Sequence, residues 1–245
     1  MKALALEKIL QSQGYGSRKW CRERIEGGDF RVDGQVFTDP KFQIDPSAHA
    51  FTVYEETFHY HEHVYLVLNK PSGYECSRSP TRHPGVLVLL SDAMRRREVQ
   101  PVGRLDHDTT GLLLLSDDGG FIHRQSSPKY HVPKTYWAHT SEIVSEGDAE
   151  QLKQGVRLND EPQPIAALSS KVIAPQTLEI VLSEGKYHQV KRMIAAIGHH
   201  CARLERVAIG KLTLSSLTLP EGSWRHLSEE ERALLVAPPN TPPLN

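Results

Sequence analysis

Apolar residues near the start of the chain follow a helical spacing. Those between residues 4 and 10 fit one face of a short amphipathic helix, which Gly14 and Gly16 end. Ser17 follows as a natural N-cap, because its side-chain oxygen can accept a hydrogen bond from a free amide of a second helix over residues 18–28. The sequence therefore begins with a predicted helix, a turn and a helix.

A hairpin pattern comes next. In DFRVDGQVFTDP, apolar positions lie on both sides of Asp33-Gly34, a dipeptide that favours a tight turn between strands. We predict a compact N-terminal domain over residues 1–46, and we interpret the polar stretch over residues 47–62 as a linker.

The pattern over residues 63–232 predicts a second, larger domain. Its strands and helices do not alternate regularly, as they would in a doubly wound sheet, so we expect an α+β fold with a mixed, mainly antiparallel sheet flanked by helices. The expected strands are 66–69, 111–116, 134–140 and 177–183, and the expected helices are 147–155 and 188–198.

Composition limits the class of protein. Hydrophobic residues make up 38% and charged residues 24% of the chain, and no apolar run reaches the roughly 18 residues of a membrane span. The N-terminus lacks the apolar core of a signal peptide, and the cysteines are odd in number without a CxxC pair, so we expect a cytoplasmic protein that does not contact a membrane. The proline-rich residues 233–245 are expected to be a disordered tail.

Charge restricts any nucleic-acid site to a local patch, because the net charge is only −1. The second predicted helix carries such a patch, with several cations three or four residues apart near its start. A solvated helix face is the alternative interpretation. The residues concerned are Arg18, Lys19, Arg22 and Arg24.

The stretch GRLDHDTTGLLLLSDDGG combines a buried strand with acidic turns. Leu112–Leu115 read as the strand, and the acids that follow it read as turn formers. Arg104 and Asp106 remain, held in a turn ahead of a rigid strand, where a catalytic side chain is well anchored. Asp106 and Asp108 together also suggest a glycosidase pair, but residues two apart say nothing about a separation across a substrate.

A second basic segment, EGKYHQVKRM, places Lys186, His188, Lys191 and Arg192 at the beginning of a helix. Cations are unfavourable at that end of the helix dipole, so the pattern indicates a nearby anion, although a solvated basic turn is an alternative. His59, His61 and His63 alternate and would share one face of a strand, but no carboxylate or cysteine pattern joins them, and we predict no metal site.

Taken together, the motifs resemble two known families. GYGSRKWCRERIEGGDFRVDGQV resembles the S4 RNA-binding domain. KPSG, GRLDHDTTGLLLLSDDG, KTY and EGKYHQVKRM occur in the order found in the pseudouridine synthases that modify ribosomal RNA. The resemblance covers nearly the whole chain except the tail.

The resemblance implies a reaction and its residues. Asp106 matches an essential aspartate that acts as a nucleophile on the base or on the sugar C1′ of a uridine, and Tyr136 matches a tyrosine that packs on the target base and accepts a proton in the final step. Lys191 matches the basic partner of the aspartate, and Leu182 the apolar position that precedes it. The target uridine must leave its stack, and we expect the guanidinium group of Arg104 to stack or bond in the vacated space; a surface arginine paired with a neighbouring acid is the alternative. No cofactor is implied, because the reaction is an isomerisation.

The resemblance also implies a ribosomal RNA partner, 16S rRNA or a small-subunit assembly intermediate. No heptad or long exposed apolar stretch calls for a dimer, so we expect a monomer. A 23S rRNA synthase is the alternative, and a non-catalytic assembly factor is a more distant one. The residues expected to contact RNA are Ser17, Arg18, Lys19, Arg22 and Arg24 in the first domain, and Lys70, Lys186 and Arg192 in the second.

Overall fold

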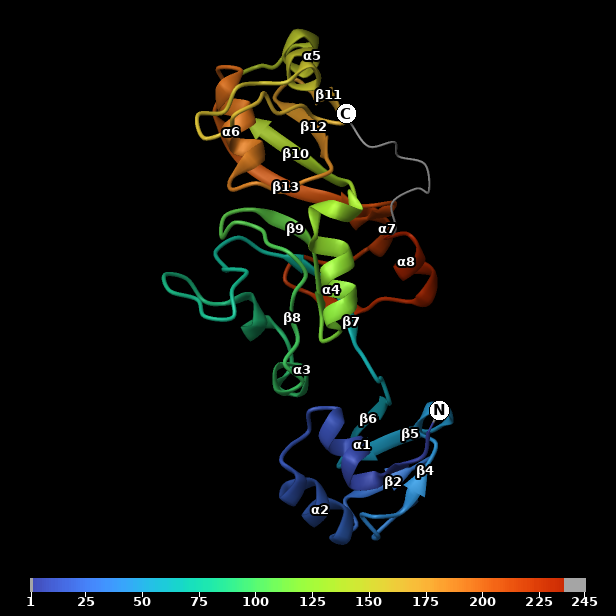
Figure 1. The fold of residues 1–245 in the computed structure, drawn as a ribbon. Helices are drawn as coiled ribbons and strands as arrows, with labels where there is room; N and C mark the ends of the chain where they lie inside the picture. Colours follow the sequence, from blue (N-terminus) through green and yellow to red (C-terminus); the bar gives the residue numbers. More distant parts are fainter. Residues whose placement is uncertain (1, 236–245) are drawn as a thin grey trace. The chain divides into compact units, whose positions relative to one another are not determined.

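The structure, a computed structural model, describes residues 2–235 and divides into two units (Figure 1). The N-terminal unit runs up to Val64 and includes Leu87–Gln100, whereas the C-terminal unit comprises Tyr65–Val86 and the chain from Pro101 onward. The elements of the N-terminal unit are β1 (Leu4–Ala5), α1 (Leu6–Ser12), α2 (Arg18–Glu26), β2 (Phe30–Val32), β3 (Gln35–Val36), β4 (Gln43–Ile44), η1 (Pro46–Ala48), β5 (Ala50–Val53), β6 (Glu56–His59), η2 (Val86–Leu89) and α3 (Asp92–Arg96). The first residue of η2, Val86, belongs to the C-terminal unit.

The predicted helices and hairpin of the N-terminal unit are confirmed. Ser17 caps α2, its side chain accepting a hydrogen bond from the amide of Trp20. Asp33 and Gly34 have φ angles of 48° and 82°, the left-handed pair that a tight hairpin turn between β2 and β3 requires. The pattern of residues 4–10 is helical only from Leu6, since the two residues before it pair with β4.

The interpretation of residues 47–62 as a linker is wrong. They contribute β5 and β6 to a four-stranded sheet of order β3-β2-β5-β6. Phe51 and Val53 alternate with partly buried positions along β5, and both are buried in the core of the unit beside Phe30. The strands are only four residues long and are joined directly by Tyr54-Glu55, so this short connection masked their two-residue period.

A second segment, distant in sequence, also belongs to the N-terminal unit. The guanidinium group of Arg97 donates to the side-chain oxygen of Gln13 (2.8 Å) and to the carbonyl oxygens of His61 (3.0 Å) and Glu62 (3.1 Å). Arg96 Nη1 donates to the carbonyl oxygen of Tyr15 (3.3 Å). The predicted boundary, which placed all of 63–232 in the second domain, is therefore wrong for residues 87–100.

A nine-stranded mixed sheet forms the centre of the C-terminal unit, in the order β11-β12-β10-β13-β9-β7-β15; in addition, β14 pairs with β13 and β8 pairs with β9. β9 and β13 pair in parallel, whereas six other strand pairs are antiparallel, so the sheet is mainly antiparallel as expected. The elements are β7 (Tyr65–Lys70), β8 (Gln100–Pro101), whose first residue lies in the other unit, β9 (Thr110–Ser116), α4 (Gly119–Ser126), η3 (Pro128–Tyr130), β10 (Lys134–Thr140), α5 (Glu146–Gln154), β11 (Ser169–Ala174), β12 (Thr177–Leu182), α6 (Gln189–Ala196), β13 (Cys201–Ile209), β14 (Leu212–Thr213), α7 (Leu214–Leu217), β15 (Trp224–His226) and α8 (Glu229–Ala233).

Strand β9 is buried on both faces. Each leucine from Leu112 to Leu115 is 0% exposed, which confirms the predicted core strand. Gly111, at its beginning, lies against the backbone of β13, where an added Cβ would stand 2.4 Å from the carbonyl oxygen of Arg206. Two strands of the sheet thus approach each other closely just after the turn that contains Asp106.

The acids after β9 do more than form a turn. Asp118 caps α4, its Oδ1 accepting from the amides of Gly120 (2.8 Å) and Phe121 (3.1 Å). The sequence pattern did not predict α4, because its first two residues are glycines and weaken the helical signal. Figure 1 shows α4 beside the sheet, where Phe121 joins the core around β9.

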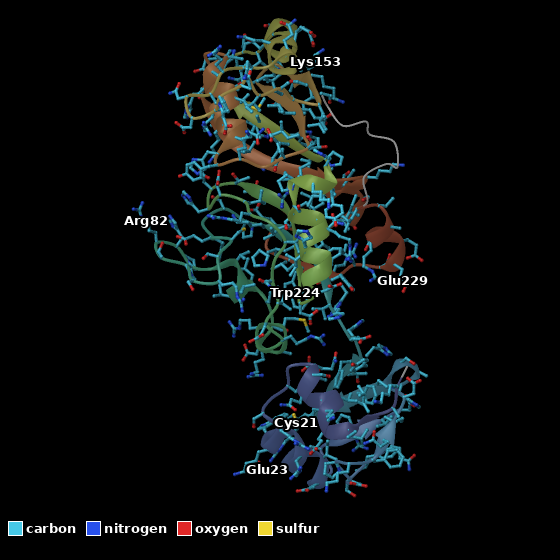
Figure 2. The ribbon with its side chains drawn as sticks, in the orientation of Figure 1. Cys21, Glu23, Arg82, Lys153, Trp224 and Glu229 are labelled. Carbon is cyan, nitrogen blue, oxygen red and sulfur yellow. The ribbon has the colours of Figure 1, made fainter. Side chains whose placement is uncertain are left out.

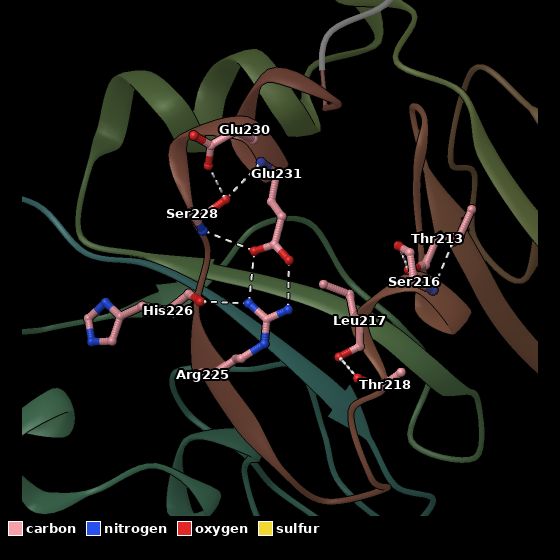
Figure 3. Close-up of polar contacts among 9 residues, drawn as sticks. All are labelled: Thr213, Ser216, Leu217, Thr218, Arg225, His226, Ser228, Glu230 and Glu231. Carbon is pink, nitrogen blue, oxygen red and sulfur yellow. Dashed lines mark hydrogen bonds and ion pairs between the residues drawn. The ribbon is translucent and has the colours of Figure 1, made fainter.

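The end of the described chain is fastened to the sheet. Arg225 in β15 forms a fork of two hydrogen bonds to the carboxylate of Glu231 in α8 (2.8 and 2.6 Å), and Ser228 caps that helix (Figure 3). Leu235 is fully buried, so the predicted disordered tail does not begin at residue 233. The rest of the predicted tail, 236–245, lies outside the described residues.

The three alternating histidines begin at the end of β6. Strand β6 ends at His59, so the alternating histidines do not share a strand face, and no group of metal-ligating side chains occurs within residues 2–235. None of the helices in this part of the chain is long and apolar enough to cross a membrane. Arg82 extends into solvent from the loop that follows β7, as the side chains in Figure 2 show.

Candidate active site

Asp106 lies in the turn that leads into β9. Its carbonyl oxygen accepts a hydrogen bond from the amide of Thr109 (3.1 Å), which closes the turn, and its side chain is 28% exposed. Two cationic or titratable side chains from the start of α6 face its carboxylate. Lys191 Nζ lies 3.6 Å from Oδ2, and His188 Nε2 lies 3.4 Å from Oδ1.

Lys191 is shared between two aspartates. Its Nζ is 2.6 Å from Oδ1 of Asp108, closer than it is to Asp106. Burial raises the pKa of Asp108, but the hydrogen bond and charge of Lys191 outweigh this effect and leave the pKa below its ordinary value. Asp108, which lies in the turn before β9, therefore holds the lysine beside Asp106.

A cavity of about 400 Å³ opens beside Asp106. Tyr136 from β10 and Leu182 from β12 form part of its wall, and both side chains are buried. Arg104 lines the cavity but is exposed, and among the described residues it has no ion-pair partner. Four of the predicted catalytic residues thus share one cavity, and the fifth, Lys191, contacts Asp106.

A half-buried lysine and a buried arginine also line this cavity, and neither was among the predicted site residues. Burial and the nearby charge of Arg206 lower the pKa of Lys134 to about 8. Arg206 is 3% exposed and donates from Nε to the carbonyl oxygen of Leu112 (2.8 Å). Tyr136 lies opposite Arg206 in the pairing of β10 with β13, a long-range neighbour relation that no local pattern contains.

The surroundings of Lys70 contradict the prediction that it contacts RNA. Its side chain is fully buried, and Nζ donates to the carbonyl oxygens of Pro71 (3.0 Å), His107 (3.1 Å) and Thr109 (2.8 Å). These bonds use all three donors of an ammonium group, so the predicted contact with phosphate is wrong. Lys70 instead joins β7 to residues 107–109, the turn that lies between Asp106 and β9.

Lys186 and Arg192 are less buried and each has an acidic partner. Lys186 Nζ is 2.6 Å from Glu161, whose hydrogen bond raises the pKa of the lysine, and Arg192 Nη2 is 3.3 Å from Asp160. Their side chains are 31% and 23% exposed, so a phosphate would have to compete with these carboxylates. Contact with RNA stays a prediction for both.

In the N-terminal unit, Glu7 organises part of the predicted basic patch. This carboxylate on α1 is 2% exposed and accepts hydrogen bonds from the guanidinium groups of Arg18 (3.0 and 2.6 Å) and Arg22 (3.1 and 3.0 Å) on α2. Lys19 is 88% exposed, and Arg24 is bound to Asp29 and Tyr54. The two arginines thus join the helices while their outer edges remain open to solvent, and their contact with RNA stays a prediction.

Replacing Glu7 by Gln is expected to destabilise the N-terminal unit by about 3 kcal/mol at pH 7, because two guanidinium groups would lose their buried counter-charge. The hydrogen bond from Arg18 lowers the pKa of Glu7 more than burial raises it. A carboxylate with a lowered pKa stabilises the fold above its unfolded pKa, about 4.5, and loses that contribution as the pH falls through the folded value.

The measurement is amide hydrogen exchange of α1 and α2 between pH 7 and pH 3. The wild type should lose protection below about pH 4.5, and the Glu7→Gln variant should be less protected at pH 7 and change less on acidification. Glu23→Gln is the control, since its pair with Lys19 is exposed and spans 3.9 Å. Equal protection of wild type and Glu7→Gln at pH 7 would contradict the prediction.

Comparison with known proteins bears on the chemistry of this cavity. A family model described as RNA pseudouridylate synthase matches residues 64–196, and one described as S4 domain matches residues 6–49. Over 95% of this chain and the full length of the relative, the sequence is 38% identical to ribosomal small subunit pseudouridine synthase A of Escherichia coli (strain K12).

A second relative and a solved structure match the chain over nearly the same length. The chain is 38% identical, over 96% of its length and 99% of the relative's, to YtzG of Bacillus subtilis (strain 168), named an uncharacterized RNA pseudouridine synthase. A crystal structure described as a pseudouridylate synthase is 32% identical and matches with a TM-score of 0.66 over 95% of this chain and 100% of that one. These matches confirm the resemblance and the two-part fold predicted from sequence. The chain belongs to the RNA pseudouridylate synthase family and begins with an S4 domain.

Proposed function

We propose that this enzyme converts one uridine of 16S ribosomal RNA to pseudouridine and that Asp106 is its nucleophile. The observation that carries the proposal is the placement of the Asp106 carboxylate beside a 400 Å³ cavity, 3.6 Å from the ammonium group of Lys191. A carboxylate in a partly closed cavity needs a compensating charge, and Lys191, itself held by Asp108, supplies it.

The chemistry balances within the nucleotide. The bond between N1 of uracil and C1′ of ribose breaks, the base turns, and C5 bonds to C1′. The proton on C5 leaves, and N1 gains one, so the product is an isomer and no oxidant, reductant or cofactor enters. Asp106 bonds covalently to the base or to C1′ between these steps and is released at the end.

The other cavity residues fit supporting roles. The buried ring of Tyr136 offers a surface on which the uracil can pack, and its hydroxyl group is the proposed acceptor of the C5 proton. Leu182 adds an apolar contact on the same wall. Arg104 is exposed and without an acidic partner in the described chain, which leaves its guanidinium group available to the space that the flipped uridine vacates.

For the substrate, the proposal rests on the similarity to the small-subunit enzyme of E. coli over nearly the full length of both chains. We propose that a monomer acts in the cytoplasm on free 16S rRNA or on a small-subunit assembly intermediate, with the S4 domain holding RNA through its phosphates. Tyr187-His188 in EGKYHQVKRM favours the small-subunit branch of the family over the 23S alternative.

Mapping of pseudouridines in rRNA from cells with and without the protein tests this proposal. We expect one pseudouridine of 16S rRNA to disappear with the protein and to return when wild type, but not Asp106→Asn, is restored. Loss of a 23S site instead would establish the alternative substrate. Return of the pseudouridine with Asp106→Asn would contradict the proposed nucleophile, and an unchanged map of both rRNAs would contradict the proposed function.

A further inference from the structure

Tyr187 is an exposed aromatic residue at the edge of the cavity. Its side chain is 75% exposed, yet its ring is stacked on the ring of His188, with centroids 3.9 Å apart and planes inclined by 16°. Both residues line the cavity that contains Asp106. No other ring stacks on Tyr187 within residues 2–235, so one face of the pair is turned to solvent.

The backbone under this pair is held in place. His188 has a φ of 48°, a left-handed conformation that is uncommon for a residue with a side chain, and it brings Nε2 to 3.4 Å from Asp106 Oδ1. Arg192 Nη1 donates to the carbonyl oxygen of Tyr187 (3.2 Å), and the backbone amide of Arg192 donates to the carbonyl oxygen of His188 (3.0 Å).

Gln189 fastens the same turn from inside. Its side chain is 4% exposed, accepts a hydrogen bond from the amide of Lys186 (2.8 Å) and donates one to Glu184 (3.2 Å). The Tyr187 ring is therefore presented on a fixed turn, which lowers the entropy that a ligand must offset when it stacks there. The turn that carries the ring and the start of α6 also carry Glu184, Lys186 and Arg192, unlike the apolar centre of a protein interface.

We propose that Tyr187, supported from behind by His188, is a platform on which the base of a nucleotide adjacent to the target uridine stacks. The inference rests on the proposed function, because it takes the cavity as the place of the flipped uridine. When that uridine enters the cavity, its neighbour must cross the rim unstacked, and an exposed aromatic face can replace the stacking lost in the RNA. His188 links this rim to the carboxylate of Asp106.

The test measures RNA affinity without turnover. In an Asp106→Asn background, fluorescence anisotropy reports binding of a labelled rRNA fragment that contains the uridine found by mapping, from whichever rRNA it lies in. Tyr187→Ala should weaken binding about 5- to 100-fold, and Tyr187→Phe should stay within about twofold, since the ring and not the hydroxyl group carries the contact. Ile143→Ala is the matched control, because Ile143 is also 75% exposed in the C-terminal unit and does not line the cavity.

A fragment without the base at one neighbouring position completes the cycle. For one of the two neighbouring positions, removal of the base should lower the affinity of the protein that retains Tyr187 by a similar factor. With that fragment, Tyr187→Ala should cause no further loss of affinity. Unchanged affinity of Tyr187→Ala for the intact fragment, or an equal loss with both neighbouring bases removed in turn, would overturn the inference. If mapping finds no target in either rRNA, the proposed function fails, and single-stranded oligouridine replaces the fragment, with the same expected and contrary results for Tyr187→Ala.

Discussion

Replacement of Asp106 by Asn is expected to lower the rate of pseudouridine formation at least about 1,000-fold while RNA affinity stays within a few-fold. The amide has nearly the shape of the carboxylate but is not a nucleophile, so the covalent step is lost and the cavity is kept. Affinity should persist because removal of a negative charge near the phosphates of RNA costs no attraction. Release of tritium from uridine labelled at C5 measures the rate, and anisotropy of labelled RNA measures the affinity.

A matched variant separates chemistry from charge. Glu146→Gln makes the same carboxylate-to-amide change at an exposed position in the first turn of α5, outside the residues that line the cavity, and should leave the rate unchanged. A rate for Asp106→Asn within tenfold of the wild type would show that another group attacks the uridine. A parallel collapse of affinity and rate would show that Asp106 is needed for binding, and the assignment as nucleophile would lose its support.

Substitution of Gly111 by Ala is expected to destabilise the C-terminal unit by roughly 4 kcal/mol or more. Gly111 has a φ of 99°, which strains any residue with a Cβ, and the added methyl group would stand 2.4 Å from the carbonyl oxygen of Arg206 and 3.0 Å from its amide nitrogen. Backbone atoms of a central strand cannot move aside as a flexible side chain can, so β9 and β13 would have to separate.

Scanning calorimetry of the two-unit protein measures this effect, as a lower melting temperature for the C-terminal transition. Gly119→Ala is the control, because Gly119 begins α4 without a left-handed φ and an added Cβ would meet nothing within 4 Å. That variant should melt at or slightly above the wild-type temperature. A Gly111→Ala protein that melts with the wild type would mean that the two strands are not in such close contact.

The sequence allowed the prediction of features that local patterns encode. Ser17 is a cap because a helix begins directly after it and its hydroxyl group can accept a hydrogen bond from that helix. Asp33-Gly34 is a turn because aspartate and glycine are among the residues that readily adopt left-handed conformations in succession. The four leucines of β9 indicate a strand buried on both sides. Asp106 was identified from a motif, and the structure then placed it at the cavity with Tyr136 and Leu182.

Features that depend on distant partners were not predictable in this way. Lys70 looks like an available cation until the turn at residues 107–109 is seen to surround its ammonium group with carbonyl oxygens. Arg206 gives no local signal, because its proximity to Tyr136 arises from strand pairing across the sheet. The role of Asp108 likewise depends on α6, more than 80 residues later, which brings Lys191 to 2.6 Å.

The return of residues 87–100 to the N-terminal unit affects how the protein is made. The polypeptide passes between the two units three times, after residues 64, 86 and 100, so no single proteolytic cut separates them. During synthesis the ribosome must release β7, the first strand of the second unit, before Arg96 and Arg97 emerge to reach Gln13 and Tyr15. The N-terminal unit therefore completes its contacts only when the first strand of the C-terminal sheet is already outside the exit tunnel.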